Sequence, residues 1–292
     1  MKKTIAALAC MLALNAHAAI TVVDDDGNPV TLQKPAQRVI AMSPHVTELL
    51  YAAGGAERIV AAVAYSDYPE AAKRLPQVGS NRQIDMERVV ALKPDLIVVW
   101  LHGSSERQIE QIRALGIPMF HSEPRKLDDI AASLNKFGKL MGTETVADAA
   151  AADLRQRLGA LQAKYAKRAP VRMFYQVWDK PLYTLNGEHI LSDAMRLCGG
   201  DNIFASQKVT APVVDIEAVL QQNPEAMFSG QRSPADVGLK MWKPYTTLTA
   251  VQRDNLFSIN GNLLNRSGPR MIEGTEILCE KLDLVRQRRK AP

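Results

Sequence analysis

The chain has 292 residues, of which 36 are Lys or Arg and 31 are Asp or Glu, so its formal net charge is +5. This length can form one large domain or two medium ones. The positive excess is mild, and no basic stripe is interleaved with aromatic residues, which argues against nucleic-acid binding. We expect no nucleic-acid partner and interpret the basic run 286–290 as a solvated helix end.

The first 18 residues predict export. A charged start at Lys2 and Lys3 precedes an apolar run over residues 4–14, and residues 16–18 read Ala-His-Ala, a small-x-small cleavage site. This pattern is typical of a signal peptide and is too short for a membrane span. Cleavage near Ala18 leaves 274 residues with a formal charge of +3. No later stretch reaches about 18 uninterrupted apolar residues, so we expect a soluble mature chain.

Strands and helices alternate in the first half of the mature chain. Residues 20–35 predict a hairpin-like arm with a turn at Asp26-Gly27-Asn28-Pro29. After the arm, short apolar runs predict buried strands at 38–42, 59–63, 96–100 and 118–121. The segments between and after them predict helices at 44–53, 87–92, 105–115 and 127–141. This order is typical of a mostly parallel sheet covered on both faces.

A longer helix interrupts the alternation. A pattern like a capping box begins at Thr145, and helical spacing continues to about Arg168, before Ala169-Pro170. The helix carries an apolar stripe at i, i+4, i+7 and i+11, made by Leu154, Leu158, Leu161 and Tyr165. About 24 helical residues span roughly 36 Å, enough to connect two domains stiffly with limited hinge motion.

The strand–helix order then resumes. Strands are predicted at 171–177, 226–229 and 256–259, and helices at 190–197, 216–222 and 271–285. We therefore predict an α/β fold of two Rossmann-like lobes, each with a mostly parallel sheet, joined by a long rigid bridging helix. The predicted parts are a signal peptide (1–18), an N-terminal lobe (19–142), the bridging helix (143–169) and a C-terminal lobe (170–292). A ligand is expected in a cleft between the lobes, near the carboxyl ends of the strands.

An internal repeat supports two similar lobes. Residues 85–95 and 215–225 share Asp, Glu, Val and Pro in register, with an acid after each Pro. A second echo pairs 53–55 (Ala-Gly-Gly) with 198–200 (Cys-Gly-Gly). Each lobe thus presents one Glu, Glu87 or Glu217, at the start of a short helix. The alternative is coincidence, because acids favour helix N-termini in general.

The cysteines and histidines of the chain indicate whether it forms a disulfide bond or a metal site. Cys198 and Cys279 remain after cleavage, and export to an oxidising compartment favours a disulfide between them over two separate buried thiols. The chain has no CxxC pair or Cys/His cluster, and its histidines lack HxH and HxxxH spacing. We therefore expect no metal site.

Aromatic residues are few, and several follow predicted strands or lie in loops. Flat rings at such positions suit a large, partly apolar ligand in a cleft, although each ring can instead pack under its own loop. These residues are Tyr65, Tyr68 and Trp100 in the first lobe and Tyr175, Trp178, Tyr183, Trp242 and Tyr245 in the second.

The chain resembles periplasmic substrate-binding proteins of the bridge-helix class, which serve ABC importers of cobalamin, haem and iron–siderophores. Within that class it is most similar to cobalamin-binding proteins, and the resemblance covers essentially the whole mature chain. The segments that carry it are 43–49 (SPHVTEL), 65–69 (YSDYP), 87–96 (ERVVALKPDL), 197–204 (LCGGDNIF) and 266–270 (RSGPR). The 87–96 motif is shared across the class, whereas 65–69 and the Cys198/Cys279 pair point to cobalamin binders.

The resemblance implies ligand contacts at Tyr65, Trp100 and Arg266, with Tyr183 near another contact. Asn81 and Ala211 stand where the family has tryptophans, which reduces the aromatic surface, and Trp178 or Trp242 are candidates to compensate. His45 is expected to face the cleft, either as a hydrogen-bonding loop residue or as an axial ligand to a metal centre.

The resemblance also implies partners. In the family, glutamates matching Glu87 and Glu217 dock onto arginines of the membrane permease, giving a two-point electrostatic register. We therefore expect a monomeric periplasmic receptor that carries cobalamin as its transported ligand, needs no cofactor and is not an enzyme. The choice between cobalamin and its precursor cobinamide stays open.

Four alternatives remain. Haem on the same scaffold requires a Tyr or His aimed at the iron. A ferric siderophore favours an arginine-rich cleft, to which Arg82, Arg266 and Arg270 are candidates to contribute. An exported enzyme is disfavoured because the chain lacks GxSxG, GxxxxGK[ST] and HExxH. A sensor ectodomain would need a signalling partner.

Overall fold

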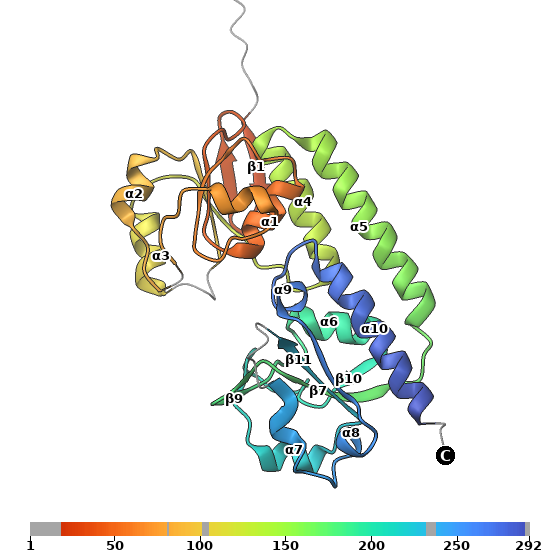
Figure 1. Cartoon of the computed structure of the whole chain (residues 1–292). Helices are drawn as coiled ribbons and strands as arrows, with labels where there is room; N and C mark the ends of the chain where they lie inside the picture. The colour runs from red at the N-terminus through yellow and green to blue at the C-terminus, as the bar shows by residue number, and fades with distance from the viewer. Residues whose placement is uncertain (1–18, 81, 101–104, 232–237, 290–292) are drawn as a thin grey trace, which may run out of the picture.

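Two α/β lobes are joined by one long helix (Figure 1). The computed structural model describes residues 19–80, 82–100, 105–231 and 238–289. The expected signal peptide therefore lies outside the described residues. Within the described part, no helix has both the length and the apolar character needed to cross a membrane. The predicted α/β fold class, with its two lobes, is confirmed.

The N-terminal lobe is built on a four-stranded parallel sheet in the order β4-β3-β5-β6. Side chains alternate across this sheet, so that Leu96 and Val98 of β5 join one apolar cluster and Ile97 and Val99 join another. Both faces are therefore covered, as predicted. The strands are β3 (Val39–Ala41), β4 (Ile59–Ala62), β5 (Leu96–Val99) and β6 (Met119–His121); the helices are α1 (Pro44–Ala52), α2 (Met86–Ala91), α3 (Glu106–Arg113) and α4 (Leu127–Met141), with a 3₁₀ turn at Glu70–Arg74. The predicted arm is the antiparallel hairpin of β1 (Ile20–Val23) and β2 (Pro29–Leu32).

The C-terminal lobe repeats this design with a parallel sheet in the order β10-β7-β11-β12. Its strands are β7 (Val171–Gln176), β10 (Gly200–Asn202), β11 (Ala226–Gln231) and β12 (Leu256–Asn260), and a hairpin of β8 (Trp178–Asp179) and β9 (Leu182–Tyr183) follows β7. Its helices are α6 (Ile190–Leu197), α7 (Ile216–Gln222), α8 (Thr249–Gln252), α9 (Gly261–Leu264) and α10 (Met271–Arg288), with a 3₁₀ turn at Gly238–Trp242. The sequence did not predict β8, β9 or β10, because each has only two or three residues and no apolar run.

The internal repeat is a structural repeat. Asp85 and Asp215 occupy the N-caps of α2 and α7, and each carboxylate accepts a hydrogen bond from the backbone N–H three residues later. After each helix, Lys93 and Asn223 adopt left-handed backbone conformations, with φ of 47° and 41°. The two segments therefore match in fold, and coincidence is excluded.

The acid that follows each Pro also has a role. Asp95 accepts hydrogen bonds from the backbone N–H groups of Gln37 and Arg38, at 2.9 and 2.8 Å, just before β3. Glu225 accepts one from the backbone of Arg172 in β7, at 3.3 Å. In both lobes this carboxylate fixes the start of the strand at an equivalent position in the sheet.

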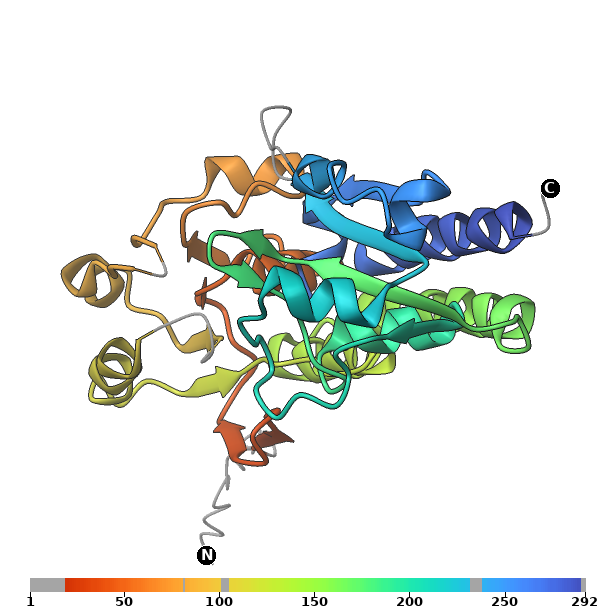
Figure 2. The same ribbon diagram turned by 90° about the horizontal axis from the view of Figure 1, so that it is seen from below.

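The bridging helix α5 spans Glu144–Tyr165. It starts one residue before Thr145, with Thr143 as its N-cap, and ends three residues short of Arg168. Leu154, Leu158 and Tyr165 of the predicted stripe are buried, because they pack against the core that runs through both lobes. Its 22 residues span about 33 Å. Both views show α10 beside α5, and Arg157 of α5 donates to Glu276 of α10 at 2.9 Å (Figures 1 and 2).

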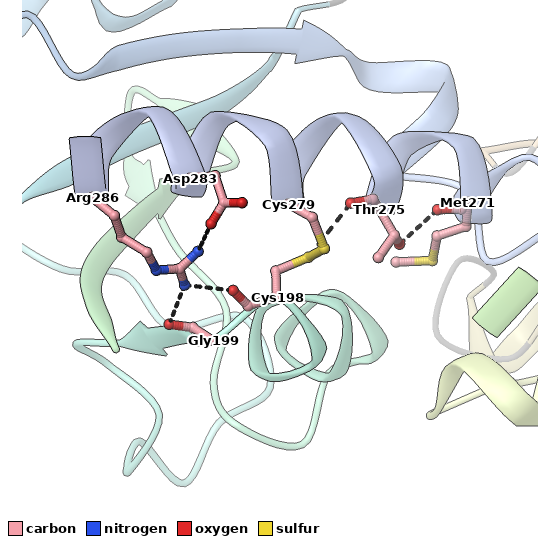
Figure 3. The surroundings of a disulfide bond; sticks show 7 residues. All are labelled: Cys198, Gly199, Met271, Thr275, Cys279, Asp283 and Arg286. Carbon is pink, nitrogen blue, oxygen red and sulfur yellow. Dashed lines mark hydrogen bonds and ion pairs between the residues drawn. A yellow bond between two sulfur atoms is a disulfide. The ribbon is translucent and has the colours of Figure 1, made fainter. Parts of the chain in front are cut away.

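A disulfide joins Cys198, at the end of α6, to Cys279 in α10, as predicted (Figure 3). About two turns further along α10, the Arg286 guanidinium donates to the carbonyl of Cys198 at 2.7 Å and to Asp283 at 2.7 Å. The covalent bond and the arginine therefore hold α10 against the same end of α6.

The basic run at the end of α10 is not simply a solvated helix end. Arg286 is buried, and Arg289 makes a two-point ion pair with Glu225, with distances of 2.6 and 2.7 Å. Arg288 donates to Asn255 at 3.1 Å. These arginines fasten the last turns of α10 to the C-terminal lobe, which corrects the sequence-based interpretation.

Candidate functional site between the lobes

The first-lobe candidates follow the carboxyl ends of parallel strands, which lie at one edge of the sheet. His45 comes after β3, Tyr65 after β4 and Trp100 after β5. The rings of His45 and Trp100 make an edge contact, with centroids 5.5 Å apart. The topology thus gathers these residues at one edge although 55 positions separate the first from the last.

Tyr65 has the most exposed of these rings, with 76% of its surface accessible. Its backbone has φ of 67°, a left-handed conformation that is costly for a residue with a large side chain. The chain around it is held firmly: Ser66 is buried and accepts a hydrogen bond from Thr47 of α1 at 3.0 Å. The backbone N–H of Asp67 donates to the carbonyl of Tyr65 at 3.0 Å.

An ion network connects this edge to the other lobe. Arg266 and Arg270, from the segment between α9 and α10, both bind Glu48 of α1, at 3.0 and 2.6 Å. Arg266 also binds Asp67 at 2.6 Å and donates to the carbonyl of Tyr65 at 3.2 Å. We call Glu48, Asp67, Arg266 and Arg270 the Glu48 cluster.

The Glu48 cluster is buried at Glu48 and open to water at Asp67, whose side chain is 44% exposed. The side chain of Glu48 is 2% exposed and that of Arg266 is 13% exposed. Burial tends to raise the pKa of the Asp67 carboxyl, but its hydrogen bond and attraction to Arg266 lower that pKa below its usual value. The Arg270 guanidinium lies 3.9 Å from the centre of the Tyr68 ring. Two arginines thus meet two carboxylates and an aromatic face.

The second lobe contributes an apolar strip at its hairpin. Trp178 and Tyr183 are directly opposite each other across β8 and β9, and Tyr183 also pairs with Val213. Directly opposed residues of antiparallel strands project to the same face, so the three side chains are neighbours. Trp178 is 44% exposed and Val213 is 57% exposed. Val213 of this strip is two positions after Ala211, where the sequence resemblance implies a tryptophan in related proteins.

Trp242 does not compensate for a missing tryptophan. Trp242 is fully buried, and its indole N–H donates to Gln176 at 2.7 Å inside the C-terminal lobe. It packs edge-on against Phe174, so its ring offers no surface to a ligand. Asn81, the second departure from the family, lies outside the described residues.

The histidines of this edge have little access to a ligand. His45 is 5% exposed, its Nδ1 lies 2.7 Å from the Ser43 hydroxyl, and its Nε2 is closed to solvent. Burial lowers the pKa of His45 to about 4, although nearby Glu123 opposes this shift, so the ring is neutral at pH 7. Both ring nitrogens of His121 are also closed to solvent. Within the described ranges, no group of three or more His, Cys, Asp or Glu side chains could hold a metal ion.

Glu87 and Glu217 lie away from this edge, on the outer helices α2 and α7 (Figure 1). Both side chains are exposed, and the burial classes of residues 85–87 and 89 repeat at 215–217 and 219. On α2, Val90 is also exposed, at 52%. Each lobe therefore presents one solvent-facing carboxylate at an equivalent position.

Sequence reasoning missed the role of Glu48. It is the one charged residue of α1, directly before Leu49 and Leu50, and an acid at a core position needs a cationic partner. That pattern was the available signal, but its partners are more than 215 positions away, so the sequence alone does not identify them.

Residues 39–263 match the family model of periplasmic binding proteins. A vitamin B12-binding protein of Yersinia pestis is 40% identical over 248 residues, which cover 85% of this chain and 86% of that protein. The crystal structure of the periplasmic vitamin B12-binding protein BtuF of Vibrio cholerae superposes with a TM-score of 0.80, at 38% identity, over 86% of this chain and 98% of that one. The periplasmic haem-binding protein RhuT from Roseiflexus sp. RS-1 shares the fold at 19% identity, with a TM-score of 0.74 over 86% of this chain and 99% of that one.

Proposed function

The chain belongs to the periplasmic binding protein family, and from this premise we propose that it captures cobalamin between its lobes and delivers it to an ABC importer. The observation that carries the ligand assignment is 40% identity, over most of both chains, to a protein named for binding vitamin B12. The haem-binding neighbour is 19% identical and supports the fold alone.

The site supports a flat, partly apolar ligand. Tyr65 offers an open ring from one lobe, and Trp178, Tyr183 and Val213 offer an apolar strip from the other. Trp100 is half-buried against His45 and supplies a further ring. Burial of such surface gives non-covalent, reversible affinity, as a transport receptor requires. We assign these residues to ligand contact; direct contact by Arg266 and His45 stays a prediction.

The alternatives fit these residues less well. Haem requires a Tyr or His aimed at the iron, and the ring nitrogens of His45 and His121 are closed to solvent. Tyr65 has an exposed side chain, so haemin is the competing ligand that the titration must include. A ferric siderophore needs cationic groups, but Glu48 and Asp67 already neutralise Arg266 and Arg270. Relatives of this family are binding proteins, so we propose a periplasmic receptor and not an enzyme.

Calorimetric titration of the signal-cleaved protein with cyanocobalamin tests the ligand. We expect tight one-to-one binding, with cobinamide measured alongside and much weaker heat from haemin and from a ferric hydroxamate. Tight haemin binding without cobalamin binding would overturn the ligand assignment and leave the fold unchanged.

We further propose that Glu87 and Glu217 dock onto cationic residues of the permease. Both side chains are exposed, and they lie at equivalent positions on the two lobes. A permease with pseudo-twofold symmetry can therefore bind one carboxylate at each of two equivalent contact points. The double variant Glu87→Ala/Glu217→Ala should bind cobalamin normally but fail to support uptake by vesicles that contain the importer. Glu57→Ala/Glu280→Ala removes two exposed acids elsewhere and serves as the control. Normal uptake by the first variant would contradict the docking role.

A further inference from the structure

The Glu48 cluster draws its members from both lobes. Glu48 and Asp67 belong to the N-terminal lobe, and Arg266 and Arg270 belong to the C-terminal lobe, about 200 positions later. This cluster is therefore a polar connection between the lobes, in addition to α5, the shared apolar core and the hydrogen bond from the Leu127 backbone to Asp193. Because its ion pairs are 2.6–3.0 Å long, a small separation of the lobes breaks them.

The same cluster reaches the backbone of Tyr65. Arg266 donates through Nη2 to the Tyr65 carbonyl and through Nη1 to both Glu48 and Asp67. Asp67 in turn donates its backbone N–H to that carbonyl. A left-handed tyrosine persists only where its surroundings hold it, and these bonds hold it from two sides.

We propose that Glu48 is a positioning residue: by fixing Arg266 and Arg270 of the opposite lobe, it holds the Tyr65 backbone in the conformation that turns its ring toward the ligand. This rests on the proposed cobalamin-binding function and deepens it. Affinity then depends on a buried residue that does not touch the ligand, and the position of Tyr65 is coupled to the separation of the lobes.

The negative charge of Glu48 is needed to hold Arg266 and Arg270 in place. It accepts a two-point interaction from Arg270, with bonds of 3.0 and 2.6 Å, and a further bond from Arg266. Replacement by Gln keeps the shape but leaves two partly buried guanidinium groups with Asp67 as the one remaining carboxylate of the cluster. The arginines then lose their fixed places, and the Tyr65 carbonyl loses the hydrogen bond from Arg266 and keeps the one from the Asp67 backbone.

A double-mutant cycle tests the coupling. Glu48→Gln and Asp67→Asn are each combined with Tyr65→Ala, and the affinity for cyanocobalamin is measured by calorimetry. We expect each single variant to bind at least fivefold more weakly than wild type, and less than twofold more weakly when Tyr65 is already Ala. Equal losses in both backgrounds would overturn the proposal, because the cluster would then act on affinity by another route.

Hydrogen exchange in the ligand-free protein gives a second readout that does not depend on the ligand. The amides of Ser66 and Asp67, which bond to the carbonyls of Val63 and Tyr65, should exchange at least tenfold faster in Glu48→Gln and Asp67→Asn. Exchange within twofold of wild type would overturn the proposal. Glu225→Gln is the matched control, because Glu225 makes a similar two-point pair with Arg289, away from Tyr65, and should change neither readout.

Two other results, misfolding of Glu48→Gln and absence of cyanocobalamin binding, leave the proposal testable. If Glu48→Gln does not fold, Asp67→Asn carries the test, since the Asp67 side chain is 44% exposed and tolerates change better. If the wild-type protein itself does not bind cyanocobalamin, the ligand assignment fails, and the exchange measurement still decides whether the cluster holds Tyr65.

Discussion

Replacement of Tyr65 by Ala should weaken cobalamin binding about 30-fold without unfolding the protein. An aromatic side chain has about 200 Å² of surface, and 76% of that of Tyr65 is open, so about 150 Å² is available. A flat ligand on one face covers about half of it, roughly 75 Å². At 25 cal/mol per Å² this is worth about 2 kcal/mol, or about 30-fold in Kd.

The choice of variants separates the ring from the backbone. Ala keeps the Cβ atom and therefore the same restriction at a φ of 67°, whereas Gly would relax it. Tyr65→Phe keeps the ring and should bind within about twofold of wild type. The affinities are measured by calorimetry, with thermal unfolding as a check on folding. A change below threefold for Tyr65→Ala would refute the claim that this open ring covers the ligand.

Two further predictions concern stability. The double variant Cys198→Ser/Cys279→Ser should lose about 4 kcal/mol of unfolding free energy in urea, because the bond closes a loop over 81 positions; a loss below about 1 kcal/mol would contradict this estimate. Burial lowers the pKa of His45 from 6.5 to about 4 in the folded protein. As the pH falls from 6.5 toward 4, the unfolded chain binds a proton at His45 that the folded protein does not, so the free energy of unfolding decreases over this range. Over that range the free energy of unfolding of His45→Gln should fall by up to about 3 kcal/mol less than that of the wild type. If the two proteins lose stability in parallel, His45 does not titrate as described.

The elements that were predictable from the sequence are those with a clear period or a clear stop signal. The apolar run of β5 and the stripe of α5 correspond directly to their buried sides, and the repeat around Pro94 and Pro224 revealed two lobes of the same topology. Short elements such as β8 and β10 have no such pattern, because their conformation is set by neighbouring strands.

The candidate site was predictable only in part, for a similar reason. Ring positions such as Tyr65 follow strand ends, which the sequence locates. Whether a ring is open or buried depends on tertiary packing, and Trp242 illustrates this, since its loop position suggested exposure and its side chain lies in the core. The Glu48 cluster depends on contacts between segments about 200 positions apart, and local patterns contain no information about that pairing.

The most direct test of the central claim is the calorimetric titration of the signal-cleaved protein with cyanocobalamin, with haemin measured in parallel. We expect one-to-one binding of cyanocobalamin with a Kd at least a hundredfold lower than that of haemin. Absence of cyanocobalamin binding by the folded protein, or tighter binding of haemin, would contradict it.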